Sequence, residues 1–131
     1  MPHTMKLKVL LVEDNRPTRW WMMSVLGEAG FWVAGPDTVQ EALRWARSFE
    51  FDLLITDWRL TPGHDGFEIL EHVRRKSPLA AAILMSGEIP EDLERHAVHA
   101  GFDRVLAKPF AAGEIVELAQ ALVKMRTMEV A

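Results

Sequence analysis

The segment KLKVLLVED, residues 6–14, determines how this chain folds. Lys6–Val12 form a nearly continuous aliphatic run, and Glu13 and Asp14 end it with two acidic side chains. A short aliphatic run that stops at polar residues is typical of a strand buried on both faces of a sheet. We therefore expect a central strand over Lys6–Val12 with two carboxylates at its carboxyl end.

Four more strand-like runs follow along the chain, at Phe31–Gly35, Asp52–Thr56, Ala80–Ser86 and Arg104–Ala107. Longer segments with apolar residues at helical spacing separate them. This alternation predicts a doubly wound α/β fold, in which helices cover both faces of a five-stranded parallel sheet. The second and fifth runs are the least hydrophobic, so we expect them at the edges.

The helical segments carry spacing and capping patterns of their own. Thr38, three residues before Glu41, is a capping-box pattern that starts the second helix, and Gly30 and Gly101 are expected to end the first and fourth helices. The first helix is expected to bury an i, i+3, i+4, i+7 stripe made of Thr18, Trp21, Met22, Val25 and Ala29.

The fourth helix, expected over Glu91–Ala100, has few apolar side chains to bury. Leu93, Val98 and alanines are its only candidates. It is therefore predicted to be the least firmly held element.

The length of 131 residues allows one domain, and a 49% hydrophobic content is enough for a core. We expect a tail at residues 1–5, the domain at residues 6–126 and a tail at residues 127–131, with no output domain. The fifth helix is expected to end at about Arg126.

Charge and cysteine content restrict the function classes. Fifteen basic and 19 acidic residues give a formal charge of −4, which argues against nucleic acid as a partner. The sequence has no cysteine and no apolar run of membrane-spanning length, so we expect a cytoplasmic protein without a membrane partner. Other proteins are the expected partners.

Chemically useful side chains follow four of the five strands. Glu13 and Asp14 follow the first, Asp57 the third, Ser86 ends the fourth and Lys108 follows the fifth. Ligands of open parallel sheets bind beyond the carboxyl ends of the strands, so these side chains are expected to share one crevice.

Three close carboxylates repel one another unless a cation is present, and carboxylate oxygens are ligands that Mg²⁺ prefers. The sequence therefore predicts a Mg²⁺ site. With a metal present, Asp57 is free to attack a phosphoryl group, while Lys108 neutralises charge on the equatorial oxygens. No general base is needed, because a carboxylate is already ionised at neutral pH.

The order Glu13-Asp14, Asp57, Ser86 and Lys108-Pro109-Phe110 resembles the receiver domain of bacterial two-component response regulators. The resemblance covers residues 6–123 and is specific, because five elements occur in order. It implies a flavodoxin-like fold with strand order 2-1-3-4-5, and chemotaxis regulators are single-domain members of the family.

The resemblance also implies roles for the acidic residues. Asp57 would be the phosphoacceptor, supplied by a sensor histidine kinase or a histidine phosphotransfer protein. Asp14, Asp57 and the backbone carbonyl of Arg59 would ligate Mg²⁺, and Glu13 would act through water. The protein would be no enzyme in the usual sense, although it would assist its own phosphotransfer and dephosphorylation.

Residues near the fourth and fifth strands would bind the phosphoryl group and transmit its presence. Ser86 resembles the switch hydroxyl and Lys108 the phosphate-binding lysine, and the bond before Pro109 is expected to be cis. A partner protein would then read the face formed by the fourth helix, fifth strand and fifth helix. Homodimerisation on phosphorylation is a further possibility that the resemblance raises.

The sequence departs from the family pattern in two places. Val105 stands where an aromatic switch residue is usual, and the loop after Asp57 has one extra residue before Pro62. Arg59 and Glu88 occupy positions that tune phosphate lifetime in the family. We hypothesise that they pair across the crevice and screen the phosphoryl group from water.

Several alternatives stay open. The receiver of a hybrid histidine kinase would have the same sequence features. The intact acidic set argues against a pseudo-receiver that binds partners without phosphorylation, but Val105 and the extra loop residue keep that alternative open. A haloacid-dehalogenase-type hydrolase would need its nucleophile after the first strand, and a flavodoxin-like cofactor binder would not place two acids there. His96 and His99 lack a third ligand, which favours a solvated helix face over a metal site.

Overall fold

The structure, a computed structural model, describes residues 6–130, with side chains described as far as Arg126. The predicted tail at residues 1–5 lies outside the described residues. Strands and helices alternate along the chain in the order β1 (Lys8–Val12), α1 (Arg16–Glu28), β2 (Trp32–Ala34), α2 (Val39–Ser48), β3 (Leu53–Asp57), α3 (Gly66–Lys76), β4 (Ala81–Ser86), α4 (Leu93–Ala100), β5 (Arg104–Ala107) and α5 (Ala112–Val130).

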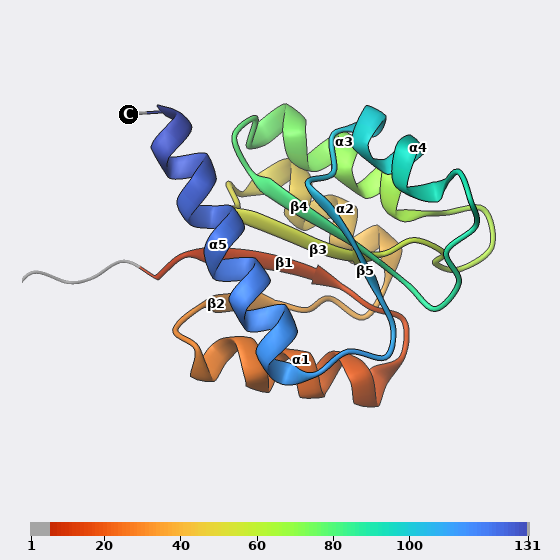
Figure 1. The fold of residues 1–131 in the computed structure, drawn as a ribbon, viewed down its shortest axis with the longest axis horizontal. Coiled ribbons are helices and arrows are strands. Elements are labelled where there is room, and N and C mark those ends of the chain that lie inside the picture. Colours follow the sequence, from red (N-terminus) through yellow and green to blue (C-terminus); the bar gives the residue numbers. More distant parts are fainter. Residues whose placement is uncertain (1–5, 131) are drawn as a thin grey trace, which may run out of the picture.

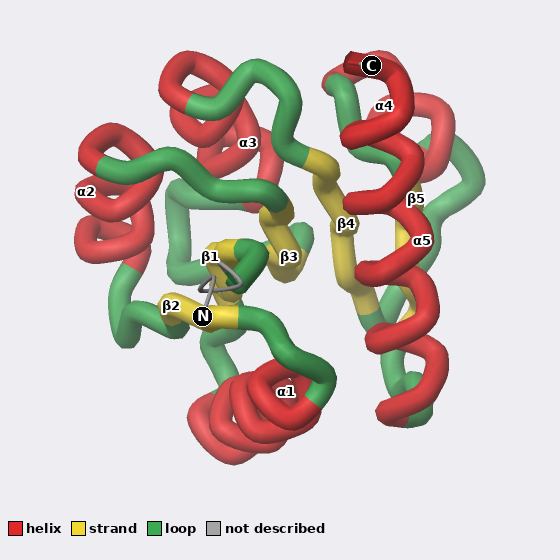
Figure 2. Tube along the Cα trace, turned by 90° about the vertical axis from the view of Figure 1, so that its left-hand side faces the viewer, coloured by secondary structure: helices red, strands yellow, loops and turns green. Residues whose placement is uncertain are grey.

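The strands form one parallel sheet in the order β2-β1-β3-β4-β5, as expected (Figure 1). Helices α1 and α5 cover one face, and α2, α3 and α4 cover the other (Figure 2). The less hydrophobic strands β2 and β5 lie at the edges. The doubly wound fold is therefore confirmed.

The core consists of two layers separated by the sheet. Successive side chains of a strand point to opposite faces, so Leu10 and Val12 pack toward α2 and α3 while Val9 and Leu11 pack toward α1 and α5. Strands β3 and β4 are buried along their whole length. The centre of the sheet is therefore a rigid platform for the residues at its carboxyl edge.

Capping follows the sequence patterns. The Thr38 hydroxyl accepts a hydrogen bond of 3.1 Å from the Glu41 amide at the start of α2. Gly101 ends α4 with a φ of 109°, a conformation that favours glycine.

The predicted stripe of α1 is partly wrong. The fully buried residues are Arg19, Met22 and Leu26, whereas Trp21 is 41% exposed. The helix is rotated so that a buried arginine faces inward, which apolar periodicity could not indicate. Trp21 instead packs beside Phe110, with ring centroids 6.0 Å apart.

The bounds of the last two helices also differ from expectation. Helix α4 begins at Leu93 after Asp92, and only Leu93 and Ala97 are buried, because Val98 is 64% exposed. Helix α5 continues to Val130, since residues 127–130 contain no glycine or proline to stop it. Residues 127–130 are therefore helical and not a tail.

A pair of identical substitutions tests the placement of the core. Leu54 in β3 is fully buried, whereas Leu79 is 56% exposed. Leu54→Ala is expected to lower the free energy of unfolding by about 2–5 kcal/mol, because it leaves a cavity. Leu79→Ala is expected to change it by less than about 0.5 kcal/mol. Urea unfolding measures both values, and equal losses would contradict this core.

Candidate functional site

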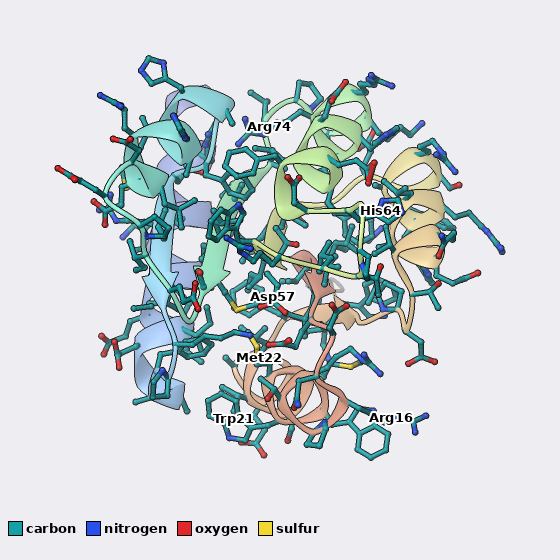
Figure 3. All side chains as sticks on the ribbon, turned by 90° about the vertical axis from the view of Figure 1, so that its right-hand side faces the viewer. Arg16, Trp21, Met22, Asp57, His64 and Arg74 are labelled. Atoms are coloured by element: carbon teal, nitrogen blue, oxygen red, sulfur yellow. The ribbon has the colours of Figure 1, made fainter. Side chains whose placement is uncertain are left out.

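The carboxyl ends of four strands meet at one edge of the sheet. Val12 pairs with Thr56, Asp57 with Met85 and Ser86 with Ala107, so β1, β3, β4 and β5 end close to the same level. Figure 3 views this edge and shows Asp57 near its centre, with α1 below and α3 above. The parallel register thus brings the predicted residues together.

Lys108 links the two buried carboxylates. Its Nζ lies 2.5 Å from Oε1 of Glu13 and 2.6 Å from Oδ1 of Asp57. The side chains of Glu13 and Asp57 are only 2% and 9% exposed, and Lys108 is 27% exposed. Lys108 therefore neutralises part of the negative charge of two carboxylates that are poorly solvated. The Lys108–Pro109 bond is cis, as expected.

Backbone amides complete the coordination of these carboxylates. The Asp14 N–H donates to Oδ2 of Asp57 at 3.3 Å, and the Asn15 N–H donates to Oε2 of Glu13 at 3.1 Å. The carboxylate of Asp14 is exposed and makes no hydrogen bond or ion pair with the described part of the chain. It is therefore available to a ligand.

Burial controls the ionisation of Asp57. Burial, together with a hydrogen bond from its carboxyl group to Glu13, raises the pKa of Asp57 to about 7, although Lys108 opposes the shift. Burial alone would also raise the pKa of Glu13, but hydrogen bonds from Asp57, Lys108 and the Asn15 amide lower it below its ordinary value. Near neutral pH the Asp57 carboxyl group is therefore partly protonated and donates to the ionised Glu13 when it holds the proton.

The neighbouring groups respond to the same charges. Burial would lower the pKa of Lys108, but the hydrogen bonds to Asp57 and Glu13 raise it above its usual range. Burial and then Glu13 raise the pKa of Asp14, while Lys108 and Arg19 oppose that rise. The acidic groups of the site therefore outnumber its positively charged groups.

This donor set fits a hard divalent cation. Such an ion would favour the ionised forms of Asp14 and Asp57. The described residues contain no cluster of three acidic or histidine side chains able to hold a metal alone. Oxygen ligands beyond side chains are therefore needed. Arg59 lines the cleft beside Asp57, and its backbone carbonyl accepts no hydrogen bond from the described residues.

That cleft opens beside Asp57 and has a volume of about 310 Å³. The residues that line it come from the ends of β3 and β4, the loops after them, and the end of β5: Asp57, Trp58, Arg59, Met85, Ser86, Gly87, Glu88 and Lys108. The space suits a small charged group better than a large organic ligand.

The predicted pairing of Arg59 with Glu88 is wrong. The Arg59 guanidinium lies 4.4 Å from the centre of the Trp58 ring, and no ion pair joins it to Glu88 among the described residues. A guanidinium over an indole face is stabilised electrostatically, and the stack needs no long reach across the cleft. Trp58 and Arg59 together form one wall of the cleft.

Ser86 and Val105 lie beside the site, and the Lys108 N–H donates a hydrogen bond of 2.9 Å to the Ser86 carbonyl. The Ser86 hydroxyl donates to the carbonyl of Glu88 and accepts from the Glu88 amide at 3.1 Å, which closes a tight turn. Val105 is half-buried against the core layer that contains α3 and α4. Both residues therefore connect the site to the side of the sheet where α4 packs.

The extra residue of the loop after Asp57 is absorbed by a small antiparallel bridge. Arg59 pairs with Asp65 across the loop, and Gly63 has a φ of 89°. Gly66 then starts α3 so close to β3 that a Cβ there would lie 2.5 Å from the Asp57 carbonyl oxygen. The loop is thereby ordered beside the site.

One residue of the site escaped prediction. Arg19 is only 3% exposed, and its Nη1 donates to the Glu13 carbonyl at 3.0 Å. The only sequence signal was its spacing three residues before Met22, and a charged residue at a core position is normally assigned to the surface. His96 and His99, in contrast, are exposed as expected.

Comparisons with known proteins agree with this geometry. The family model of the response regulator receiver domain matches residues 9–120. A response regulator receiver protein of Anaeromyxobacter sp. is 36% identical over 111 residues, which are 85% of this chain and 46% of that protein. The chain spans about half the length of the curated relatives that it matches first.

Solved structures share the fold. A CheY-like receiver domain protein of Methanospirillum hungatei superposes with a TM-score of 0.87 at 22% identity, covering 95% of this chain and 99% of that one. A response regulator of Burkholderia pseudomallei, solved with a phosphorylated aspartic acid, a calcium ion and citrate, has a TM-score of 0.79 at 23% identity, covering 96% and 74%.

The family match, the sheet order and the acidic edge of the sheet lead to one assignment: this chain belongs to the response regulator receiver domains of two-component signalling.

Proposed function

We propose that Asp57 accepts a phosphoryl group from a phosphohistidine of a sensor histidine kinase or a histidine phosphotransfer protein. The contact of Asp57 with Lys108, at 2.6 Å in a buried site, carries this proposal. The Asp57 oxygen forms the new P–O bond as the P–N bond to histidine breaks, and the histidine nitrogen keeps the electron pair. The phosphorylated aspartate in the Burkholderia protein supports the same chemistry here.

Each neighbour has a separate part in that transfer. Lys108 neutralises charge on the phosphoryl oxygens, and Asp14 with Asp57 and the Arg59 carbonyl would hold Mg²⁺, with Glu13 acting through water. When bound, Mg²⁺ supplies positive charge that stabilises the transferring group. The same residues would assist hydrolysis of the aspartyl phosphate, so the protein influences its own dephosphorylation.

The signal would leave through the face of α4, β5 and α5. The Ser86 hydroxyl now closes the turn with Glu88, and it would leave that turn to bind the phosphoryl group. Because α4 buries only Leu93 and Ala97, a rearranged turn can shift this helix with a smaller loss of buried contacts than any other helix. Val105 lies on β5 in this path and would respond by packing, since it has no ring to rotate.

The downstream reader would be a protein, with homodimerisation on phosphorylation as a further possibility. No helix within residues 6–130 has the length and apolar character needed to cross a bilayer. We propose that the protein acts as a response regulator in the cytoplasm. The chain could also be the receiver of a hybrid kinase, and the departures at Val105 and before Pro62 keep a pseudo-receiver as the competing function.

Phosphorylation of Asp57 can be tested with a matched pair of aspartates on one strand segment. With Mg²⁺ and acetyl phosphate, intact mass is expected to show one phosphoryl adduct on the wild type and on Asp52→Asn. Asp52 directly precedes β3, at the end of the strand away from Asp57, and accepts a hydrogen bond from the Lys8 amide. Asp57→Asn should give no adduct. An adduct on Asp57→Asn would place the phosphoryl group on another residue and contradict the proposal. No adduct on the wild type would favour the pseudo-receiver.

The pH dependence of metal affinity tests the ionisation of Asp57. Its pKa is raised to about 7, so the proton competes with the metal below that pH and is absent above it. Mg²⁺ affinity should therefore fall as pH decreases, approaching about tenfold per unit below pH 7, and level off above pH 8. Tryptophan fluorescence titrations at several pH values measure this affinity. A Mg²⁺ affinity that changes by no more than the experimental error between about pH 5.5 and 8 would contradict the assignment.

The Trp58–Arg59 wall is expected to shield the aspartyl phosphate from water. Arg59→Ala should speed loss of the phosphoryl group several-fold, because it removes the side chain that covers Trp58 beside Asp57. Arg44→Ala, which removes an exposed arginine paired with Glu41 on α2, serves as the control. Equal dephosphorylation rates for the two variants would exclude shielding by Arg59.

A further inference from the structure

Arg19 is a charged side chain in the core whose position needs explanation. It lies in α1 and is 3% exposed. Its Nη1 donates to the Glu13 carbonyl at 3.0 Å and its Nη2 lies 2.6 Å from Oδ1 of Asp37. Its buried Nε has no hydrogen-bond partner in the structure. Burying a guanidinium with an unpaired N–H is costly, so packing alone is a poor reason for an arginine here.

The contact with Glu13 places Arg19 at one end of a particular peptide unit. The Glu13 carbonyl and the Asp14 N–H belong to the same unit, and that N–H donates to Oδ2 of Asp57 at 3.3 Å. A peptide unit is planar, so fixing its carbonyl fixes the direction of its N–H. Arg19 is thus connected to Asp57 through one rigid group.

The same peptide unit also carries the two acidic side chains of the site. Glu13 precedes it and reaches Lys108, and Asp14 follows it with an exposed carboxylate. A rotation of this unit would therefore move both carboxylates and the amide together. Asp37, in the loop between β2 and α2, holds the far end of Arg19 through a side chain that is 70% exposed.

We propose that Arg19 is a positioning residue of the phosphoacceptor site, which holds the Glu13–Asp14 peptide so that its amide faces Asp57 and its acidic side chains meet a divalent cation. Asp37 supports Arg19 and so extends this control to the loop after β2. The metal part of the inference rests on the proposed function. The hydrogen bond to Asp57 does not.

Two readouts separate positioning from a merely structural role. Calorimetry gives the Mg²⁺ affinity, and the ¹H–¹⁵N signal of the Asp14 amide reports its hydrogen bond to Asp57 without metal. Arg19→Met should weaken Mg²⁺ binding about 10–100-fold, the range typical when a group supporting a metal ligand is lost. It should also shift the Asp14 amide signal upfield. Arg19→Lys, which keeps the charge and one donor, should recover part of both losses.

Asp37→Asn provides a test that does not threaten folding, because that side chain is mostly exposed. It should change both readouts in the same direction as Arg19→Met, to a smaller extent. Glu71→Gln is the matched control, since Glu71 forms an exposed 2.6 Å pair with Arg75 on α3, away from the site. It should leave both readouts at wild-type values.

Specific outcomes overturn the inference. A folded Arg19→Met with wild-type Mg²⁺ affinity and an unchanged Asp14 amide would overturn it. If Arg19→Met does not fold, Asp37→Asn decides, and behaviour identical to Glu71→Gln would be contradictory. Wild-type protein that binds no Mg²⁺ and forms no adduct would refute the proposed function, while the Asp14 amide signal in the metal-free variants would still decide the role of Arg19.

Discussion

The structure depends on the electrostatic imbalance at the carboxyl edge of its sheet. Glu13 and Asp57 are buried there against a single lysine, and one result is that the pKa of Asp57 rises to about 7. Two buried carboxylates and one ammonium group leave negative charge that the protein does not compensate. A divalent cation or a tightly bound proton must therefore complete the site, and this requirement makes Asp57 responsive to its surroundings.

The fold supplies the rigidity that this imbalance needs. Strands β1, β3 and β4 are held by apolar layers on both faces, so the residues that follow them cannot move apart to relieve repulsion. Close approach of α3 at Gly66 fixes the carbonyl of Asp57 as well. Flexibility is left to the turn at Ser86 and to α4, which buries little. A change in charge at Asp57 is therefore expected to be relieved on that side of the molecule.

The sequence was sufficient for the fold and for the site residues at the strand ends, because both follow from strand periodicity and from what lies where the strands stop. Glu13, Asp57 and Lys108 could be placed together without any coordinates, since parallel strands end at one edge. The contact partners of individual long side chains could not be predicted. Arg59 stacks on Trp58 and does not reach Glu88, and Arg19 points inward where Trp21 was expected, because each arginine found partners that no periodicity encodes. The length of α5 was underestimated for a simpler reason, since helices fray or continue without a marked stop.

The central claim is that the buried charge of Asp57 burdens the metal-free protein and that a divalent cation relieves it. The most direct measurement is the thermal unfolding midpoint of the wild type and of Asp57→Asn at pH 8, with and without Mg²⁺. Without Mg²⁺, Asp57→Asn should unfold at the higher temperature, because it removes a carboxylate whose ionisation opposes folding above pH 7. Saturating Mg²⁺ should raise the midpoint of the wild type and much less that of the variant. Equal midpoints for the two proteins, unaffected by Mg²⁺, would contradict the claim.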